Sequence, residues 1–391
     1  MSLDSFLSAQ LDERRRLSRY RHRQCIESAQ GPVVRRQGRE VINFCSNDYL
    51  GLANHPAVCS AKKAAIEFYG AGSGASHLVC GHSQEHHALE QELAEFTGRE
   101  RALLFSTGYM ANLAIGQVLG VKSAAVFEDK LNHASLLDAG LGSHAEFQRY
   151  RHNDLQHLKQ RLQTCTKEHK LILSDGVFSM DGDCAPITEI AALAKEHNAW
   201  FVVDDAHGLG VLGATGAGLL EVEALSQNDV PVLMGTLGKA FGSFGAFVAG
   251  SEALIESLIQ FARTYIYTTA LPPDVAAASR ASLRLVREAH QGREHLSSLI
   301  CRFRTGAKSL NLRLWASDTA IQPIILGTDQ AALNASQALL DKGFWVSAIR
   351  PPTVPEGSAR LRLTLTAAHS SEQVDALLMG LGELKVQGLF Q

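Results

Sequence analysis

Leu233-Met-Gly-Thr-Leu-Gly-Lys-Ala-Phe-Gly-Ser-Phe-Gly245 contains a single lysine, Lys239, between two apolar runs. Small residues surround this lysine, and glycine lets a bulky group approach the backbone closely. Desolvation disfavours a charged ammonium group, and a neutral amine is the form that attacks an aldehyde. A lysine in an ordinary glycine-rich turn has the same pattern, so the rest of the chain must separate the two readings.

Short apolar segments alternate with helical patterns from about residue 86 onward. This alternation predicts an α/β fold, in which helices cover both faces of a mostly parallel sheet. We expect an N-terminal helix and short hairpin over 1–45, a large α/β domain over 46–280 and a small α+β domain over 281–391. The expected strands of the large domain are 102–105, 124–127, 147–150, 171–173, 200–203 and 232–234.

Composition excludes several classes of protein. The formal net charge of −3 gives no overall basic field, so we expect no nucleic-acid partner. No apolar run approaches the roughly 18 residues that span a bilayer, so we expect no membrane partner. Seven scattered cysteines without CxxC spacing favour a reducing, cytoplasmic location. His82, His86 and His87 lack a closing acidic or cysteine set, and the sequence has no HExxH motif, so we expect no metal.

Polar residues follow the predicted strands, where ligands bind in open α/β sheets. Together they provide a helix N-terminus, histidines, a carboxylate, hydroxyls and the lysine. Such groups match a phosphorylated, aromatic, positively charged cofactor that forms a Schiff base. The segments are Ser106 to Tyr109, Glu128 to His133, Ser174 to Ser179, Asp204 to His207 and Gly235 to Lys239.

Each group has an expected role and a simpler alternative. Backbone N–H groups of Gly108 and Tyr109 can bind phosphate, although many strand–helix turns look the same. Asp204 ends an apolar strand, so its carboxylate can pair with a protonated pyridine nitrogen or merely cap a helix. His207 can bind a phenolate oxygen and His133 can stack on a pyridine ring, but each histidine alone is compatible with a structural role.

Longer motifs carry a resemblance to a known family. Asp204-Asp-Ala-His207 and Thr236-Leu-Gly-Lys239 resemble the pyridoxal-phosphate (PLP) site of the α-oxoamine synthases, fold-type I enzymes. The resemblance covers nearly the whole chain. It includes Asn43-Phe-Cys-Ser-Asn-Asp-Tyr-Leu-Gly-Leu52, Leu131-Asn-His-Ala-Ser135, Gly176-Val-Phe-Ser-Met-Asp-Gly182, Ala348-Ile-Arg-Pro-Pro-Thr-Val-Pro355 and Arg360-Leu-Arg-Leu-Thr-Leu-Thr-Ala-Ala-His369.

The resemblance implies a PLP-dependent homodimer with its active site at the subunit interface. Lys239 would form the Schiff base, Asp204 would meet the pyridine nitrogen, and His133 would stack on the ring. Thr268 or Thr269 would reach the partner subunit's phosphate. The other implied cofactor contacts are Gly108, Tyr109, Ser179, His207 and Thr236, and the implied substrate contacts are Arg21, Asn47, His133, Arg350 and Thr353.

The resemblance also implies a reaction. The Arg350-Pro-Pro-Thr353 pattern favours the branch that condenses L-alanine with a pimeloyl thioester and releases CO2, in biotin synthesis. The thioester carrier is either coenzyme A or an acyl carrier protein. One alternative is the branch that joins glycine to an acetyl group, and another is a catalytically silent scaffold subunit. Lys239 and Asp204 are both present, which disfavours the scaffold.

Overall fold

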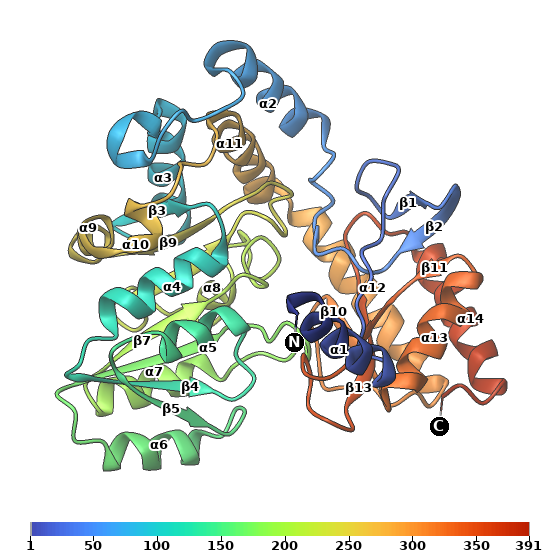
Figure 1. Cartoon of the computed structure of the whole chain (residues 1–391). Helices are drawn as coiled ribbons and strands as arrows, with labels where there is room; N and C mark the ends of the chain where they lie inside the picture. The colour runs from blue at the N-terminus through green and yellow to red at the C-terminus, as the bar shows by residue number, and fades with distance from the viewer. Residues whose placement is uncertain (1, 391) are drawn as a thin grey trace. The chain divides into compact units, whose positions relative to one another are not determined.

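The computed structural model describes residues 2–390, which form two compact units (Figure 1). The larger unit comprises Asp48–Ser179 and Cys184–Arg293. The smaller unit comprises the described residues up to Asn47, Met180–Asp183, and those from Glu294 onward. Among the described residues, no helix is both long and apolar enough to cross a membrane.

A seven-stranded sheet forms the centre of the larger unit, with the strand order β3-β9-β8-β7-β6-β4-β5. β9 is antiparallel to both of its neighbours, and the other pairs are parallel. The predicted mostly parallel α/β sheet is therefore confirmed. The strands are β3 (Arg101–Phe105), β4 (Ala124–Asp129), β5 (Glu146–Tyr150), β6 (His169–Asp175), β7 (Ala199–Asp204), β8 (Val232–Thr236) and β9 (Ala246–Gly250).

Helices cover both faces of this sheet because its strands are apolar on both sides. One face packs against α4, α5 and α9, and the other packs against α3, α6, α7, α8 and α11. Alternate residues of one strand enter different cores, as Val202 and Val203 of β7 do. The helices are α2 (Pro56–Tyr69), η1 (His77–Gly81), α3 (Gln84–Thr97), α4 (Gly108–Leu119), α5 (Ala134–Leu141), α6 (Leu155–Thr164), α7 (Ile187–Glu196), α8 (Leu219–Val222), α9 (Glu252–Phe261), α10 (Arg263–Ile266) and α11 (Pro273–Glu288).

The smaller unit contains two three-stranded sheets. In one, the hairpin of β1 (Val33–Arg36) and β2 (Arg39–Asn43) is joined by β11 (Phe344–Trp345). Gln37 and Gly38 both have positive φ, as the tight turn of the predicted hairpin requires. The other sheet has the order β10-β13-β12. Its strands are β10 (Ile321–Gly327), β12 (Ser347–Ile349) and β13 (Ala359–Thr364), and the unit's helices include α1 (Leu3–Arg16), α13 (Asp329–Asp341), α14 (Ser371–Val386) and most of α12 (His290–Ser309).

Candidate active site

Three parallel strands end at the same edge of the large sheet, each with a polar residue. Asp175 ends β6, Asp204 ends β7, and Thr236 ends β8. A cavity of about 170 Å³ lies there, and Lys239 lines it three residues beyond Thr236. It brings together all eight predicted cofactor contacts. Its lining residues are Gly108, Tyr109, His133, Ser135, Asp175, Ser179, Asp204, Ala206, His207, Met234, Thr236 and Lys239.

Helix α4 points its N-terminus into this cavity. Thr107 caps the helix, with its Oγ1 accepting a hydrogen bond from the Met110 N–H at 3.2 Å. The first residues of the helix, Gly108 and Tyr109, line the cavity. Helix N-termini carry unpaired N–H groups and partial positive charge, so this end of the cavity suits an anionic group such as a phosphate.

The Asp204 carboxylate is 4% exposed and lies on the α4 side of the sheet. Its Oδ2 accepts a hydrogen bond from Asn112 Nδ2 at 2.8 Å, and its Oδ1 accepts one from the Ala206 N–H at 3.0 Å. Both donors are neutral, and the carboxylate also faces the cavity. A buried carboxylate favours a cationic partner, so a ligand with a protonated ring nitrogen fits here.

His133 lies at the N-terminus of α5, where its main-chain N–H donates to Asp175 Oδ2 at 2.6 Å. Burial of the ring lowers the pKa of His133, the nearby Asp204 charge opposes this, and Lys239 adds to it. Burial and the Asp204 charge raise the pKa of Asp175 well above its usual value. The site therefore favours a neutral imidazole beside the carboxylates.

The remaining cavity residues add hydroxyl and imidazole groups. His207 Nδ1 lies 2.6 Å from the hydroxyl of the buried Tyr49. Thr236 Oγ1 donates to the Gly245 carbonyl at 3.1 Å and accepts from the Gly238 N–H at 3.3 Å. These bonds hold the backbone on both sides of Lys239 and thereby fix where its side chain begins.

Asn112 and Ser135 form part of the site although sequence reasoning did not single them out. Both are buried, and Ser135 lines the cavity. The predicted site residues directly follow strands, whereas Asn112 lies inside α4. Its position four residues after Gly108 was the available signal, because residues i and i+4 share one face of a helix.

The four predicted substrate contacts outside this cavity lie in the smaller unit. Arg21 Nη2 donates to Thr353 Oγ1 at 3.1 Å, and both residues line a cavity of about 70 Å³ with Arg350. Burial lowers the pKa of Arg350, and Arg21 adds to this effect. Asn47 lies apart from this group, with its Oδ1 accepting from Arg362 Nη2 at 3.2 Å. The smaller unit thus places three of the four together.

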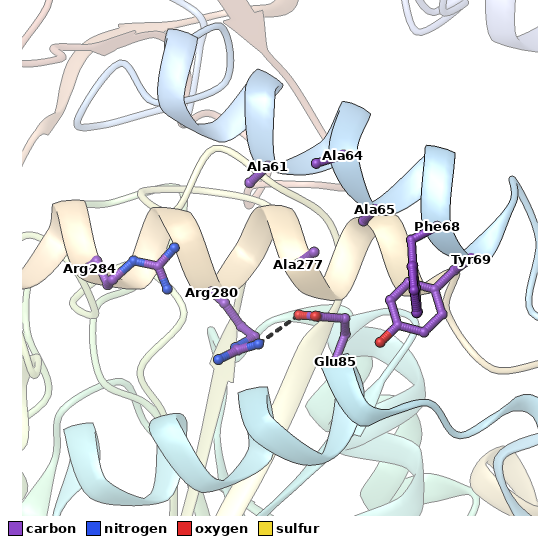
Figure 2. A pocket seen from close by; sticks show the side chains of 9 residues that line it. All are labelled: Ala61, Ala64, Ala65, Phe68, Tyr69, Glu85, Ala277, Arg280 and Arg284. Atoms are coloured by element: carbon purple, nitrogen blue, oxygen red, sulfur yellow. Dashed lines mark hydrogen bonds and ion pairs between the residues drawn. The ribbon is translucent and has the colours of Figure 1, made fainter.

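A larger cavity of about 540 Å³ lies between α2 and α11, above α3 (Figure 2). Alanines, Phe68 and Tyr69 form much of its wall. Its Arg280 forms ion pairs with Glu85 and Glu92, both at 2.7 Å, so that charge is already matched. Its lining contains no lysine or histidine, so the chemistry expected of a Schiff-base enzyme belongs to the smaller cavity.

Three histidines, His77, His82 and His86, have ring nitrogens within 4.8 Å of one another. In the sequence, His82 and His86 lie close to His87, but in the structure the third member of the cluster is His77. His86 Nε2 donates to the Leu271 carbonyl at 2.6 Å, and its Nδ1 accepts from the Ser83 N–H at 2.9 Å. Because both nitrogens of His86 are engaged, it has no lone pair to offer a metal without breaking a helix cap.

Comparisons with known proteins agree with this geometry. The family model for aminotransferase class I and II matches residues 39–381, and the chain belongs to this family. At 60% identity, the chain resembles the 8-amino-7-oxononanoate synthase of Saccharophagus degradans, covering 98% of this chain and 97% of that protein. The corresponding enzyme of Cellvibrio japonicus is 59% identical, covering 98% and 96%.

Solved structures give the same picture of the fold. A lysine-to-alanine variant of serine palmitoyltransferase from S. paucimobilis, with a bound PLP–myriocin aldimine, has a TM-score of 0.95 at 34% identity, covering 100% of this chain and 99% of that one. An 8-amino-7-oxononanoate synthase from Francisella tularensis has a TM-score of 0.77 at 32% identity, covering 89% and 99%. The predicted fold class is thus confirmed.

Proposed function

We propose that the protein uses PLP to condense L-alanine with a pimeloyl thioester, giving 8-amino-7-oxononanoate, CO2 and free carrier in biotin synthesis. One structural observation carries this proposal: Lys239 and Asp204, from neighbouring strand ends, line the same cavity. The near-full-length similarity to 8-amino-7-oxononanoate synthases supports the choice of reaction.

The donor groups of the cavity fit PLP part by part. Its phosphate would lie at the N-terminus of α4, on Gly108 and Tyr109, with Thr236 nearby. Asp204 would pair with the ring nitrogen, and His207 and Ser179 would meet the ring's polar substituents. His133 would cover the ring face, and Lys239 would hold the aldehyde carbon. All of these residues line the cavity.

Bound PLP supplies an aldehyde that joins the substrate amine and an electron-poor ring that stabilises negative charge at the α-carbon. The chain's own residues then move protons. The Lys239 amine lines the cavity and would act as the base that takes the proton from the alanine α-carbon. Asp204, held by Asn112 and Ala206, would keep the ring nitrogen protonated.

The reaction forms one carbon–carbon bond and breaks two bonds. The alanine α-carbon bonds to the thioester carbonyl carbon, and the carbon–sulfur bond breaks to release the carrier thiol. The bond from the α-carbon to the original alanine carboxylate breaks, and CO2 leaves. Lys239 or His133 returns a proton to the α-carbon. Arg21 and Thr353 would bind the acyl substrate, while Arg350 and Asn47 would hold the group derived from the amino acid.

We further propose a homodimer. The loop before η1 is tied to the segment after α10, because Ser73 Oγ donates to the Ala270 carbonyl at 2.6 Å and the Ala270 N–H donates to the Ala75 carbonyl at 3.0 Å. On these linked segments Val79 is 77% exposed and Tyr267 is 71% exposed. We propose that these two exposed apolar side chains belong to one subunit interface, and Thr268 or Thr269 would then reach the partner's phosphate. We also propose a cytoplasmic location, since none of the seven cysteines, all of which the structure describes, forms a disulfide.

A product assay tests the reaction. PLP-loaded protein should form 8-amino-7-oxononanoate from L-alanine and pimeloyl-CoA, detected by mass spectrometry. Replacing the substrates by glycine and acetyl-CoA tests the alternative branch, and pimeloyl-acyl carrier protein tests the carrier. Lys239→Ala should abolish turnover, whereas Lys63→Ala, at an exposed site on α2, should not. Full activity of the Lys239→Ala variant would refute the proposal.

A further inference from the structure

The Asn112 side chain joins two parts of the active site. Its Nδ2 lies 2.8 Å from Asp204 Oδ2 and 2.8 Å from Ser135 Oγ. Ser135 Oγ in turn lies 2.7 Å from His133 Nδ1. Asn112 is 0% exposed and Ser135 is 1% exposed. One buried amide therefore connects the carboxylate beneath the cavity to the imidazole that lines it.

The directions of these hydrogen bonds follow from the donors available. An amide nitrogen has two N–H donors, and Asn112 gives one to Asp204 and one to Ser135. A flipped amide would turn its oxygen toward the carboxylate, which repels it. Asn112 Oδ1 is buried without a partner among the described protein atoms. The Asn112 amide thus uses both of its N–H donors, while its Oδ1 acceptor is buried without a partner at a cost in free energy.

The hydrogen bond from Asn112 to Ser135 also fixes the direction of the hydrogen bond between Ser135 and His133. Because Ser135 Oγ accepts from Asn112, its own O–H is available to donate to His133 Nδ1. The Ser135 main-chain N–H also points at this nitrogen, at 3.3 Å. His133 Nδ1 is therefore an acceptor, and the neutral ring carries its proton on Nε2. Asp204, Asp175 and Lys239 are the titratable groups facing His133.

We propose that Asn112 is a positioning residue for the cofactor ring, acting on the ring nitrogen through Asp204 and on the ring face through Ser135 and His133. This inference rests on the proposed function, because it takes the cavity to bind PLP. One arm holds the carboxylate in the orientation that meets the ring nitrogen. The other arm holds His133 in its Nε2–H form, so that the ring face meets a neutral imidazole.

Two variants separate the arms. Asn112→Leu keeps the approximate volume and removes both donors, so PLP should dissociate about tenfold more readily or worse, since Asp204 loses a buried partner. The visible circular dichroism of the bound cofactor should weaken because the ring is less fixed. Ser135→Ala removes only the second arm, so PLP affinity should stay within about threefold. The pKa of His133 in the holoenzyme should rise, because the Ser135 O–H favours the neutral ring.

The measurements are PLP titration by fluorescence, visible circular dichroism and NMR titration of labelled histidines, with His133→Asn assigning the His133 signal. Gln322→Leu is the matched control, because it also removes a buried amide that donates two hydrogen bonds, to the carbonyls of Ser317 and Thr319 in the smaller unit. It should lower stability without changing PLP affinity or the dichroism. If Asn112→Leu does not fold, Asn112→Ser, which also cannot bridge both partners, replaces it.

The outcomes are distinguishable. Weaker PLP binding in the Asn112 variant, with a raised His133 pKa in Ser135→Ala, supports the proposal. Wild-type protein that binds PLP alongside variants with unchanged affinity, dichroism and His133 titration would overturn the positioning role and leave the proposed function standing. Wild-type protein that does not bind PLP at all would overturn both. A Gln322→Leu effect as large as that of Asn112→Leu would reduce Asn112 to an ordinary structural residue.

Discussion

Adjacent carboxylates on one strand end have different tasks. Asp204 faces α4 and the cavity, whereas Asp205 Oδ2 accepts the Leu219 N–H at 2.7 Å where α8 begins. Burial raises the pKa of Asp205 to about 8. This division follows from strand alternation, because neighbouring residues point to opposite faces. The roles assigned to the individual cavity residues stay predictions that the variants above test.

Asn112 shows where prediction from sequence stops at this scale. A polar residue after an apolar strand is visible in the sequence, because the strand order brings such residues to one edge. An asparagine inside a helix is not visible as a site residue, since its partners Asp204 and Ser135 come from two other elements. Only the packing of α4 and α5 on the sheet brings these three together.

His369 provides a prediction about pH. Its ring is 1% exposed and stacks on Phe44, its Nδ1 accepts the Thr366 N–H at 3.0 Å, and its Nε2 donates to the Asn43 carbonyl at 3.1 Å. Burial lowers the pKa of His369 to about 4. The folded state therefore takes up this proton later than the unfolded state, whose histidine titrates near 6.5.

The free energy of unfolding should consequently fall as pH drops from about 6.5 to about 4, by up to about 3 kcal/mol from this residue. Urea unfolding of wild type and His369→Gln checks this, because glutamine can accept and donate in similar directions but does not titrate. The variant should lose less stability than wild type across that window, and the two profiles should run parallel above pH 7. Equal losses in both proteins would contradict the assignment.

At the scale of elements, most helices and strands were predictable and their ends were less so. The charged pattern of residues 1–30 predicts a helix up to the Gly31-Pro32 break, but α1 ends at Arg16. Ser18 has φ +57° and Arg19 pairs with Asp329 and Glu356, so contacts in the smaller unit outweigh helix propensity. The apolar pattern of residues 344–349 predicts one strand, but the structure divides it into β11 and β12, which join different sheets.

Two further element boundaries needed the structure. β9 was seen only as an apolar run after Lys239, and it proves to be the antiparallel strand between β3 and β8. Because glycine often follows the end of a helix, Gly382 predicts that the last helix ends there, but α14 continues to Val386. A Cβ at Gly382 would lie 3.2 Å from Leu310 Cδ2, so this glycine serves close packing instead of ending the helix.

The crossing of α4 and α5 yields a prediction at this scale. A Cβ on Gly116 would lie 2.5 Å from the Ala139 carbonyl oxygen, which is a main-chain atom that cannot turn away. Gly116→Ala should therefore push the helices apart and cost about 1–3 kcal/mol of stability. It should also weaken PLP binding, because these helices carry Asn112 and Ser135.

Chemical denaturation and PLP titration measure both effects. Gly72→Ala is the matched control, because no atom lies within 4 Å of its added Cβ and its φ is not positive. We expect the Gly72→Ala control to match wild type in both stability and PLP affinity. Wild-type stability and PLP affinity in Gly116→Ala would mean that the helix crossing is not the constraint that we describe.

At the scale of the whole molecule, the family and fold were predictable because motifs extend over nearly the entire chain. The similarity of the chain to known enzymes over nearly its full length confirms the predicted family and fold. The domain boundaries predicted after residues 45 and 280 stay a prediction. Sequence alone also could not place Met180–Asp183 in the smaller unit, where Arg360 Nη1 lies 2.6 Å from Asp181 Oδ1.

The proposed homodimer is tested by sedimentation. Wild-type protein should sediment as a dimer, and Val79→Asp should shift it toward monomer because a charge would be buried at the interface. Val386→Asp is the control, since Val386 is 91% exposed on α14 in the smaller unit. A dimer that is equally stable in the Val79→Asp variant would exclude this surface.

We propose above that a single lysine in this cavity holds PLP opposite Asp204. Borohydride reduction of the PLP-loaded protein fixes the cofactor to the amine that carries it, and peptide mass spectrometry then identifies that amine. We predict that the reduced cofactor is attached to Lys239 alone and that the Lys239→Ala variant carries none. A label on another lysine, or none on wild-type protein, would contradict it.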